Sequence, residues 1–184
     1  NIMENSLVNQ GVNFVEKNMV VENDDRKIKI CNSILQIMYK YIQIVRKSCE
    51  AGGILIGREN SGNSNLIIEY VTEPMASDKR SRCRFSRKDK GHLEFFKKVY
   101  EENSEIYGYI GEWHTHPENI PHYSFIDANN WKKIGEEMKD RNQYHIIVGI
   151  QQVGIWEYNA DKKKITQICS VDWKGILKEN ETLF

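Results

Sequence analysis

The residues best suited to chemistry lie in one stretch of the chain, where His114, His116, Ser124 and Asp127 follow one another at short intervals. On a β-strand, residues two apart point to the same face, so a strand here presents both imidazoles to one side. Pro117 cannot continue a central strand, so the chain leaves the sheet directly after His116. Ser124 can then cap a helix, and Asp127, one turn further on, lies on the same side as Ser124.

This set of donor atoms is typical of a catalytic metal site. Two imidazole nitrogens and one carboxylate oxygen leave the fourth position of a tetrahedral zinc ion open to water, whereas structural zinc sites are closed by four protein ligands. The scattered cysteines include no C-x-x-C pair, which sets a structural cysteine site aside. The spacing therefore predicts one zinc ion per chain, held by His114, His116 and Asp127.

Glu50 is the candidate general base. It begins the run Glu50–Gly57 (Glu-Ala-Gly-Gly-Ile-Leu-Ile-Gly), which suits a buried strand, and a carboxylate entering such a strand is costly unless a donor or cation receives it. A zinc-bound water, whose pKa is about 7, would do so. Glu50 would take its proton and pass it to the leaving amine. Ser124 would donate to the developing oxyanion, which in enzymes contributes roughly 3–4 kcal/mol.

The same residues also have ordinary structural interpretations. The two histidines could be satisfied strand residues, and Asp127 could be a first-turn carboxylate that the helix dipole favours. Ser124 could be a helix cap alone, although capping and oxyanion donation can coexist.

Glu112 competes with Glu50 for the role of base, because it shares the face of His114 and His116. Its position behind the ligands along the same strand better suits a supporting contact, so we favour Glu50. His122 would close the open zinc position if it were a ligand, so we interpret it as a loop or substrate-side residue.

Other candidate groups lie outside this motif. His92 and His145 are interpreted as structural residues. The basic stretch Lys79–Arg82, with Arg84 and Arg87, is interpreted as a solvated loop, and the alternative is that it grips an acidic surface of a substrate protein.

The elements that must position the motif follow from hydrophobic periodicity and turn residues. The sequence predicts strands at residues 27–31, 50–57, 66–71, 82–86, 106–115, 144–150, 153–158 and 165–173, the last closing the chain. It predicts three helices: one capped by Asn32 or Ser33 and carrying Ile34, Leu35, Met38, Ile42 and Val45; one at 88–103 with Leu93, Phe96, Val99 and Tyr100 on one face; and one at 124–138. Helices among mostly hairpin-linked strands predict one α+β domain at residues 27–184, preceded by a loose arm or early edge strand in residues 1–26.

Length and composition limit the function classes. The chain has 184 residues, enough for one core, with 40% hydrophobic and 28% charged residues as in soluble globular proteins. Lys+Arg and Asp+Glu number 26 each, so the chain lacks the global positive charge of a nucleic-acid-binding protein. No apolar run approaches the roughly 20 residues that span a bilayer, and the first residues lack signal-peptide character. We therefore expect a cytoplasmic protein without nucleic-acid or membrane partners.

Two patterns together resemble the JAMM (MPN) metalloprotease family over about residues 27–173. These are Glu50 with its Gly-Gly-x-Leu-x-Gly tail, and His-x-His-Pro-x6-Ser-x2-Asp. The resemblance implies a single MPN/JAB domain of the cytidine-deaminase-like fold, with a mixed, mostly antiparallel sheet flanked by helices. It also implies zinc on His114, His116 and Asp127, with Glu50 as base and Ser124 as donor.

The flanking residues Arg84–Ser86 and Tyr109–Pro117 resemble a narrower group. These are bacterial JAB isopeptidases encoded beside E1- and E2-like enzymes in antiphage operons, including CBASS-associated members. The resemblance implies hydrolysis of the bond between the C-terminus of a ubiquitin-like or nucleotidyltransferase-type (CD-NTase-type) protein and a lysine. The modifier, its conjugates and the E1- and E2-like proteins are the candidate partners.

Three other functions stay open at this point. The chain could be a JAMM peptidase that trims the tail of a small sulfur-carrier or ubiquitin-like precursor, or a non-catalytic MPN scaffold, although such scaffolds usually lack the ligands. A nucleic-acid role gains no support from the charge balance. Segments 73–84 and 117–123 are the candidate substrate contacts, because they are polar and irregular and flank the predicted metal face. The family resemblance further implies that an extended C-terminal tail of the substrate adds as a strand beside the site.

Overall fold

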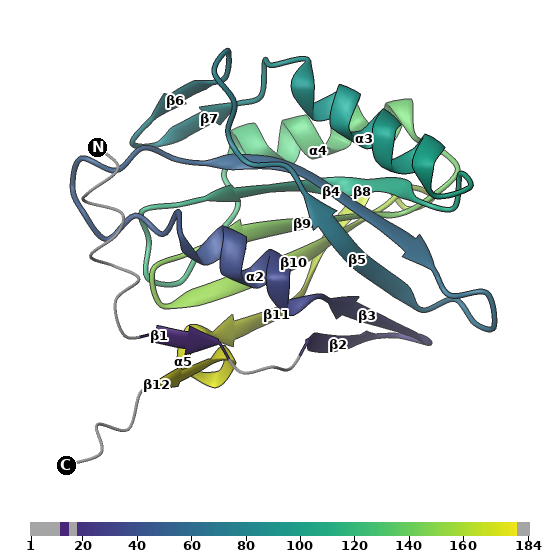
Figure 1. The fold of residues 1–184 in the computed structure, drawn as a ribbon, viewed down its shortest axis with the longest axis horizontal. Helices are drawn as coiled ribbons and strands as arrows, with labels where there is room; N and C mark the ends of the chain where they lie inside the picture. Colours follow the sequence, from purple (N-terminus) through teal and green to yellow (C-terminus); the bar gives the residue numbers. More distant parts are fainter. Residues whose placement is uncertain (1–11, 15–17, 180–184) are drawn as a thin grey trace.

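A computed structural model describes residues 12–14 and 18–179 of the chain. An eight-stranded sheet in the order β11-β10-β9-β8-β4-β5-β3-β2 runs through the protein (Figure 1). Its strands are β2 (Met19–Asn23), β3 (Arg26–Ile30), β4 (Gly52–Glu59), β5 (Leu66–Val71), β8 (Gly108–Thr115), β9 (Gln143–Val148), β10 (Gln152–Asn159) and β11 (Lys164–Asp172). Two small sheets pair β6 (Lys79–Ser81) with β7 (Arg84–Ser86) and β1 (Val12–Phe14) with β12 (Leu177–Glu179). The helices are α2 (Asn32–Tyr39), α3 (Gly91–Glu102), α4 (Phe125–Glu137) and the short α5 (Trp173–Ile176).

Helices cover both faces of the large sheet, α2 on one side and α3 and α4 on the other (Figure 1). Alternation along β4 shows the two cores: Leu55 packs in the cluster that includes α2, while Ile54 and Ile56 pack with Val99 of α3. The predicted α+β class is therefore confirmed.

The sheet is mixed. Hairpins link β4 to β5 and β9 to β10, as the sequence predicted, and two further hairpins link β2 to β3 and β10 to β11. In contrast, β3 pairs with β5 and β8 pairs with β9 in parallel. Parallel neighbours need a crossover connection, and α4 provides it between β8 and β9. The crossover brings the start of α4 back toward the end of β8, where the predicted metal ligands lie.

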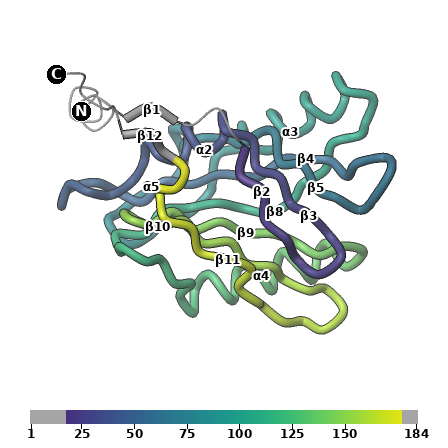
Figure 2. Tube along the Cα trace, turned by 90° about the horizontal axis from the view of Figure 1, so that it is seen from below, coloured from purple at the N-terminus to yellow at the C-terminus, as the bar shows by residue number. Residues whose placement is uncertain are grey.

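The large sheet curls until its two edge strands, β11 and β2, come into contact (Figure 2). Side chains join the two ends across this approach. Asn23 Nδ2 donates to Glu157 Oε2 at 2.8 Å, and Arg26 Nη1 donates to the Tyr144 hydroxyl at 3.1 Å. The curl therefore brings the β2–β3 hairpin next to β9 and β10, and polar side chains join them there.

The first helix is shorter than its hydrophobic spacing predicted. It ends at Tyr39, and Val45 is 41% exposed, although Ile42 stays buried. After Ile42, the next buried side chain is polar: Gln43 is 0% exposed and donates to the carbonyl oxygens of Ser48 and Arg82. The chain must turn here to reach β4, and a polar side chain stabilises that turn.

The predicted cap of this helix is also wrong. Cys31 is the N-cap residue and makes no side-chain cap hydrogen bond. Instead, Asn18 Oδ1 accepts a hydrogen bond from the Asn32 N–H at 3.1 Å. A residue distant in sequence therefore satisfies one of the free donors at the helix start.

The region between residues 79 and 102 differs from the prediction in two ways. The single strand at 82–86 is a β6–β7 hairpin, and Leu93, predicted on the buried face of the next helix, is 51% exposed. His92 is buried in its place because Asp78 and Thr72 bind both of its ring nitrogens. Polar contacts, which periodicity does not register, set the rotation of this helix.

At the two ends of the chain, residues 19–23 form the early edge strand, and β11 does not close the chain, since α5 and β12 follow it. The division between an arm and a domain at residues 26 and 27 stays a prediction. Residues 1–11 and 15–17 lie outside the described part of the chain.

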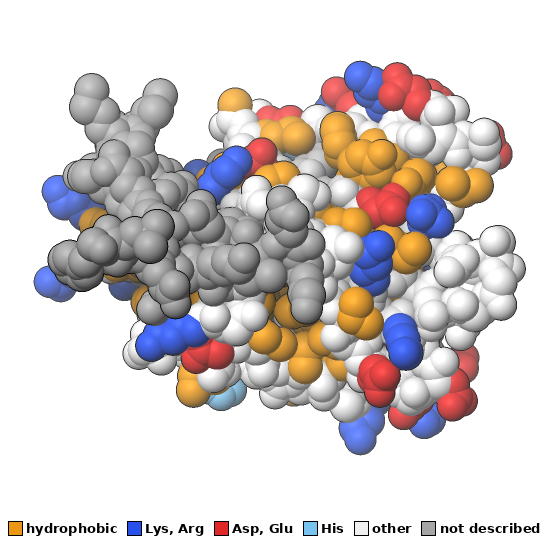
Figure 3. All heavy atoms as spheres, turned by 60° about the horizontal axis from the view of Figure 1, so that its bottom comes forward, with side chains coloured by type: hydrophobic (Ala, Val, Ile, Leu, Met, Phe, Trp, Pro, Cys, Tyr) orange, Lys and Arg blue, Asp and Glu red, His pale blue; other side chains and the backbone are white. Residues whose placement is uncertain are grey.

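On the face shown in Figure 3, positive and negative side chains are interspersed with apolar ones, as the formal net charge of zero would suggest. Among the described residues, no helix is long and apolar enough to cross a membrane.

Gly111 permits the close approach of β8 and β9. A Cβ at this position would overlap the Tyr144 carbonyl oxygen. We expect Gly111→Ala to lower the free energy of unfolding by about 1–3 kcal/mol through overpacking. Thermal denaturation should show it as a fall of roughly 2–4 °C in Tm per kcal/mol.

The matched control is Gly62→Ala, because a Cβ on Gly62 would meet nothing within 4 Å. Its Tm should equal that of the wild type. Equal Tm values for both variants would show that β8 and β9 have more room than the structure gives them.

Candidate active site

His114 and His116 extend from the end of β8, at the centre of the large sheet. His114 pairs with Gly52 of β4 on one side and with Ile147 of β9 on the other. The His116 N–H donates to the Val148 carbonyl at 3.0 Å, so the backbone stays aligned one residue beyond the strand. The two Nε2 atoms lie 3.0 Å apart. The predicted presentation of both imidazoles to one side is thus observed.

Asp127 reaches the same point from the first turn of α4. A capping box fixes it: Ser124 Oγ accepts from the Asp127 N–H at 3.2 Å, and the Ser124 N–H donates to Asp127 Oδ2 at 2.6 Å. Asp127 Oδ1 lies 3.2 Å from His114 Nε2, and Oδ2 lies 3.5 Å from His116 Nε2. Burial alone would raise the pKa of Asp127, but hydrogen bonds from His114 and Ser124 outweigh it and lower this pKa.

The donor atoms of His114, His116 and Asp127 lie within 4.8 Å of one another and could hold a metal ion. A cation among these three electron-rich atoms would offset the repulsion between them. Two imidazole nitrogens and one carboxylate oxygen are the donors zinc prefers, and three protein ligands leave a position open for water. A further carboxylate supports the set, because Glu118 Oε2 lies 3.5 Å from His116 Nδ1 and can fix the orientation of that ring.

Glu50 lies beside this donor set but outside it. Its side chain is 5% exposed, and its Oε1 lies 3.9 Å from His116 Nε2. Burial raises the pKa of Glu50 to about 7; the charge of Asp127 also raises it, while His114 lowers it. The carboxyl group can therefore both accept and release a proton near neutral pH.

Glu112, the rival base, is engaged by three donors. Its Oε1 accepts from Arg87 Nε and from the Tyr109 hydroxyl, each at 3.0 Å, and its Oε2 accepts from Asn130 Nδ2 at 2.9 Å. With both oxygens occupied, Glu112 is poorly placed to take a proton from water. Glu112 joins the segment after β7 to β8 and α4, so it has the supporting position that the sequence favoured for it.

A cleft of about 460 Å³ is lined by Glu50, Glu112, His114, His116 and Asp127. One wall is the stretch from Cys83 to Lys88, and the other is formed by Pro117, Glu118 and the start of α4 with Ile126. The predicted contact segments 73–84 and 117–123 therefore meet the cleft only at their ends, and β7 with the residues after it forms most of the first wall. His122 is not among the residues that line the cleft.

The basic stretch before and within this wall is largely structural. Arg80 Nε donates to the Glu50 carbonyl at 2.7 Å, and Arg82 Nη1 donates to the Arg46 carbonyl at 2.8 Å. Arg87 binds Glu112. Guanidinium groups that hold backbone carbonyls leave no signal in the sequence pattern, which explains why the solvated-loop interpretation missed them.

His92 and His145 are both fully buried, outside the donor set. His145 stacks on Trp131, with ring centroids 4.5 Å apart, and its Nδ1 accepts from the Glu112 N–H at 3.2 Å. Their predicted structural role agrees with these positions.

A larger hollow of about 790 Å³ lies at the opposite end of β4 and β8. Two of the carboxylates in it already have partners: Glu59 pairs with Arg26 at 2.6 Å, and Glu157 accepts a hydrogen bond from Asn23. The smaller cleft, where the metal-ligand set and a buried carboxylate converge, is the candidate active site.

A family model described as prokaryotic homologs of the JAB domain matches residues 45–161. This chain belongs to the JAB-domain family. The matched stretch contains Glu50, His114, His116, Ser124 and Asp127, and the family resemblance inferred from those residues is confirmed.

Curated relatives of this JAB-domain protein share one name, CD-NTase/cGAS isopeptidase. The Escherichia coli (strain TW11681) relative is 33% identical over 111 residues, which cover 60% of this chain and 70% of the relative. That of Pseudomonas aeruginosa (strain BWHPSA011 / Pa011) is 33% identical over 68% of this chain and 80% of its own. The Vibrio cholerae (serotype O1, strain ATCC 39315 / El Tor Inaba N16961) relative is 28% identical over 82% of this chain and 93% of its own.

Stability at acidic pH tests the environment of His145. Burial lowers its pKa from 6.5 to about 3, so the folded protein keeps the ring neutral while the unfolded chain binds a proton. The stability that this group contributes is complete above pH 6.5 and is lost as pH falls toward 3, by up to about 1.4 kcal/mol per pH unit. Urea unfolding with EDTA present, at a series of pH values, measures this loss.

The matched variant is His145→Phe, which can keep a ring against Trp131 but does not titrate. The difference in unfolding free energy between wild type and variant should be constant above pH 6.5 and should shrink below it. A difference that stays constant down to pH 4 would contradict the assignment of His145 as a buried neutral residue.

Proposed function

We propose that this protein is a zinc-dependent isopeptidase. It hydrolyses the bond between the C-terminus of a CD-NTase/cGAS-type or ubiquitin-like protein and a lysine side chain. The observation that supports the proposal is the convergence of His114, His116, Asp127 and Glu50 in one cleft. The shared name of the three curated relatives supports the class of substrate.

Zinc would be held by the Nε2 atoms of His114 and His116 and by the carboxylate of Asp127. Bound there, a zinc ion supplies Lewis acidity to the scissile carbonyl and lowers the pKa of water to about 7. The protein contributes the fixed geometry: β8 aims the histidines, and the capping box on Ser124 holds the carboxylate at the helix start.

Glu50 would carry the proton. Its carboxylate accepts a proton from the attacking water as the new carbon–oxygen bond forms. It then gives this proton to the lysine nitrogen as the carbon–nitrogen bond breaks, so that an acid and a free amine are released. Burial raises the pKa of Glu50, which strengthens its carboxylate as a proton acceptor in the first half of this cycle.

Ser124 would have two roles. In this structure its hydroxyl lies 2.7 Å from Asp127 Oδ2 and donates to it, which orients the metal ligand. To donate to a developing oxyanion, the hydroxyl must rotate away from Asp127. The capping hydrogen bond from the Asp127 N–H to Ser124 Oγ does not use the hydroxyl hydrogen, so capping is compatible with oxyanion donation. The hydrogen bond to Asp127 Oδ2 is broken when the hydroxyl rotates.

The first test is Glu50→Gln, assayed on a bacterial CD-NTase joined through its C-terminus to a lysine, and in parallel on a ubiquitin-like conjugate. Gln keeps the shape but cannot take a proton, so we expect about one zinc per chain and a loss of cleavage of at least about 100-fold. Zinc content by elemental analysis and cleavage by gel mobility measure the two effects.

The control is Glu59→Gln, the same change at the exposed far end of β4, which should cleave as the wild type does. A wild type that holds zinc and cleaves neither conjugate would contradict the isopeptidase proposal, and a wild type that binds no zinc would contradict the metal site.

Ser124→Ala separates capping from catalysis. Loss of the cap should reduce the free energy of unfolding by about 1 kcal/mol. Loss of the oxyanion donor should reduce kcat by about 100- to 1000-fold. Both should be measured at saturating zinc, so that a weaker metal site does not imitate the second effect. A lower Tm with an unchanged kcat would leave Ser124 as a cap alone.

A further inference from the structure

We propose that a buried chain of side chains, Asp78–His92–Thr72, positions Glu50 by fixing the β6–β7 hairpin to the sheet. The inference rests on the proposed role of Glu50 as general base. Asp78, His92 and Thr72 would be positioning residues, since none of them lines the cleft.

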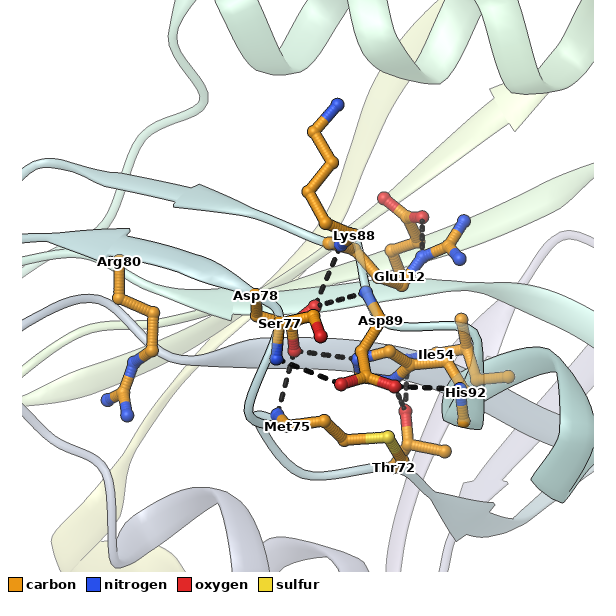
Figure 4. Close-up of polar contacts among 12 residues, drawn as sticks. Ile54, Thr72, Met75, Ser77, Asp78, Arg80, Lys88, Asp89, His92 and Glu112 are labelled. Atoms are coloured by element: carbon orange, nitrogen blue, oxygen red, sulfur yellow. Dashed lines mark hydrogen bonds and ion pairs between the residues drawn. The ribbon is translucent and has the colours of Figure 1, made fainter.

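Asp78 joins the two ends of the segment that carries the hairpin (Figure 4). Its Oδ2 accepts from the Met75 N–H at 2.8 Å, before β6, and its Oδ1 accepts from the N–H groups of Lys88 and Asp89 at 2.8 and 2.9 Å, after β7. The side chain is fully buried. One carboxylate thus holds together the two backbone segments at the base of the hairpin.

His92 connects this carboxylate to the sheet. Its Nε2 lies 2.8 Å from Asp78 Oδ2, and its Nδ1 lies 2.5 Å from Thr72 Oγ1. Thr72 Oγ1 also accepts from the Ile54 N–H of β4 at 2.9 Å. A neutral His92 with its hydrogen on Nε2 satisfies every group: Thr72 donates to Nδ1, and His92 donates to Asp78.

The charge state of Asp78 agrees with this direction of donation. Burial would raise the pKa of Asp78, but the backbone N–H donors and His92 outweigh it and lower this pKa to about 2. Thr72 also reaches β8, because its carbonyl oxygen accepts from Trp113 Nε1 at 2.9 Å. The chain therefore ends on the two strands that carry the active site.

The hairpin in turn holds Glu50. The Glu50 N–H donates to the Ser81 carbonyl at 2.7 Å, and Arg80 Nε donates to the Glu50 carbonyl at 2.7 Å. Phe85 of β7 lines the cleft together with Glu50. The Phe85 ring occupies the space that a Cβ on Gly52 would need, so the hairpin lies directly against the start of β4.

Glu50 needs this support because it lies before β4, which begins at Gly52. The backbone of Glu50 is bound on both its N–H and its carbonyl by β6. A misplacement of about 1 Å in a catalytic group can reduce the rate about 100-fold. Loosening the hairpin would therefore reduce turnover without touching a metal ligand.

The experiment compares two pairs of variants. Thr72→Val removes the hydroxyl with little change of shape, and Thr72→Ser keeps it. Arg80→Met removes the donor to Glu50 from an exposed side chain, and Lys79→Met makes a similar change one residue away, also at an exposed position. Each is assayed for kcat and KM on the CD-NTase–lysine conjugate, for zinc per chain, and for amide hydrogen exchange of Glu50 and residues 79–86.

We expect Thr72→Val and Arg80→Met to lower kcat by about 10- to 100-fold, more than they change KM. Both should bind zinc as the wild type does, and both should exchange the Glu50 amide faster. Thr72→Ser and Lys79→Met should match the wild type. Because Arg80 is exposed, its variant still tests whether the hairpin positions Glu50 if Thr72→Val does not fold.

Two results would overturn the inference: a Glu50 amide that exchanges in either variant as in the wild type, or faster exchange with an unchanged kcat. If the wild type cleaves no conjugate, the proposed function fails. Amide exchange in Thr72→Val against Thr72→Ser then still decides whether the buried chain holds Glu50 in place.

Discussion

The antiparallel pairing of β4 with β8 is the interaction on which the rest of the active site depends. It places Gly52 opposite His114, and the alignment continues when the Thr115 N–H donates to the Ala51 carbonyl at 2.8 Å and Thr115 Oγ1 accepts from the Ala51 N–H at 3.0 Å. Because β8 carries His114 and leads into His116, while Glu50 lies just before β4, a shift of one residue would separate Glu50 from the two histidines. The register of these two strands thus sets how Glu50 lies relative to the histidines.

The site also depends on buried polar groups that are satisfied by one another. Gln43 accepts from Thr115 Oγ1 and donates to two loop carbonyls, and Asp78 collects three backbone N–H groups. A buried polar group without a partner costs about 1–3 kcal/mol, so each of these groups strongly selects the one arrangement that satisfies it. The result is an irregular segment, residues 40–51, and a hairpin that are both fixed without regular pairing to the large sheet.

Each of the three predicted metal ligands is placed first by local structure. Asp127 is set by the capping box within its own helix turn, and the two histidines by the alternation of β8. These are short-range rules, which is why the spacing predicted that the three side chains would meet. Their approach to one another still needs the crossover of α4 between the parallel strands β8 and β9, and this crossover follows from the sheet topology.

The sequence by itself determined the α+β class, most strands, the convergence of His114, His116 and Asp127, and the family, because periodicity, capping and motif spacing act over a few residues. It did not determine where α2 ends, which face of α3 is buried or that residues 79–86 form a hairpin. Those features depend on Gln43, Asp78 and His92, whose partners are distant in sequence and whose polarity suggests exposure. Only the tertiary structure shows that such residues are buried, since their burial is favourable only when every partner is in place.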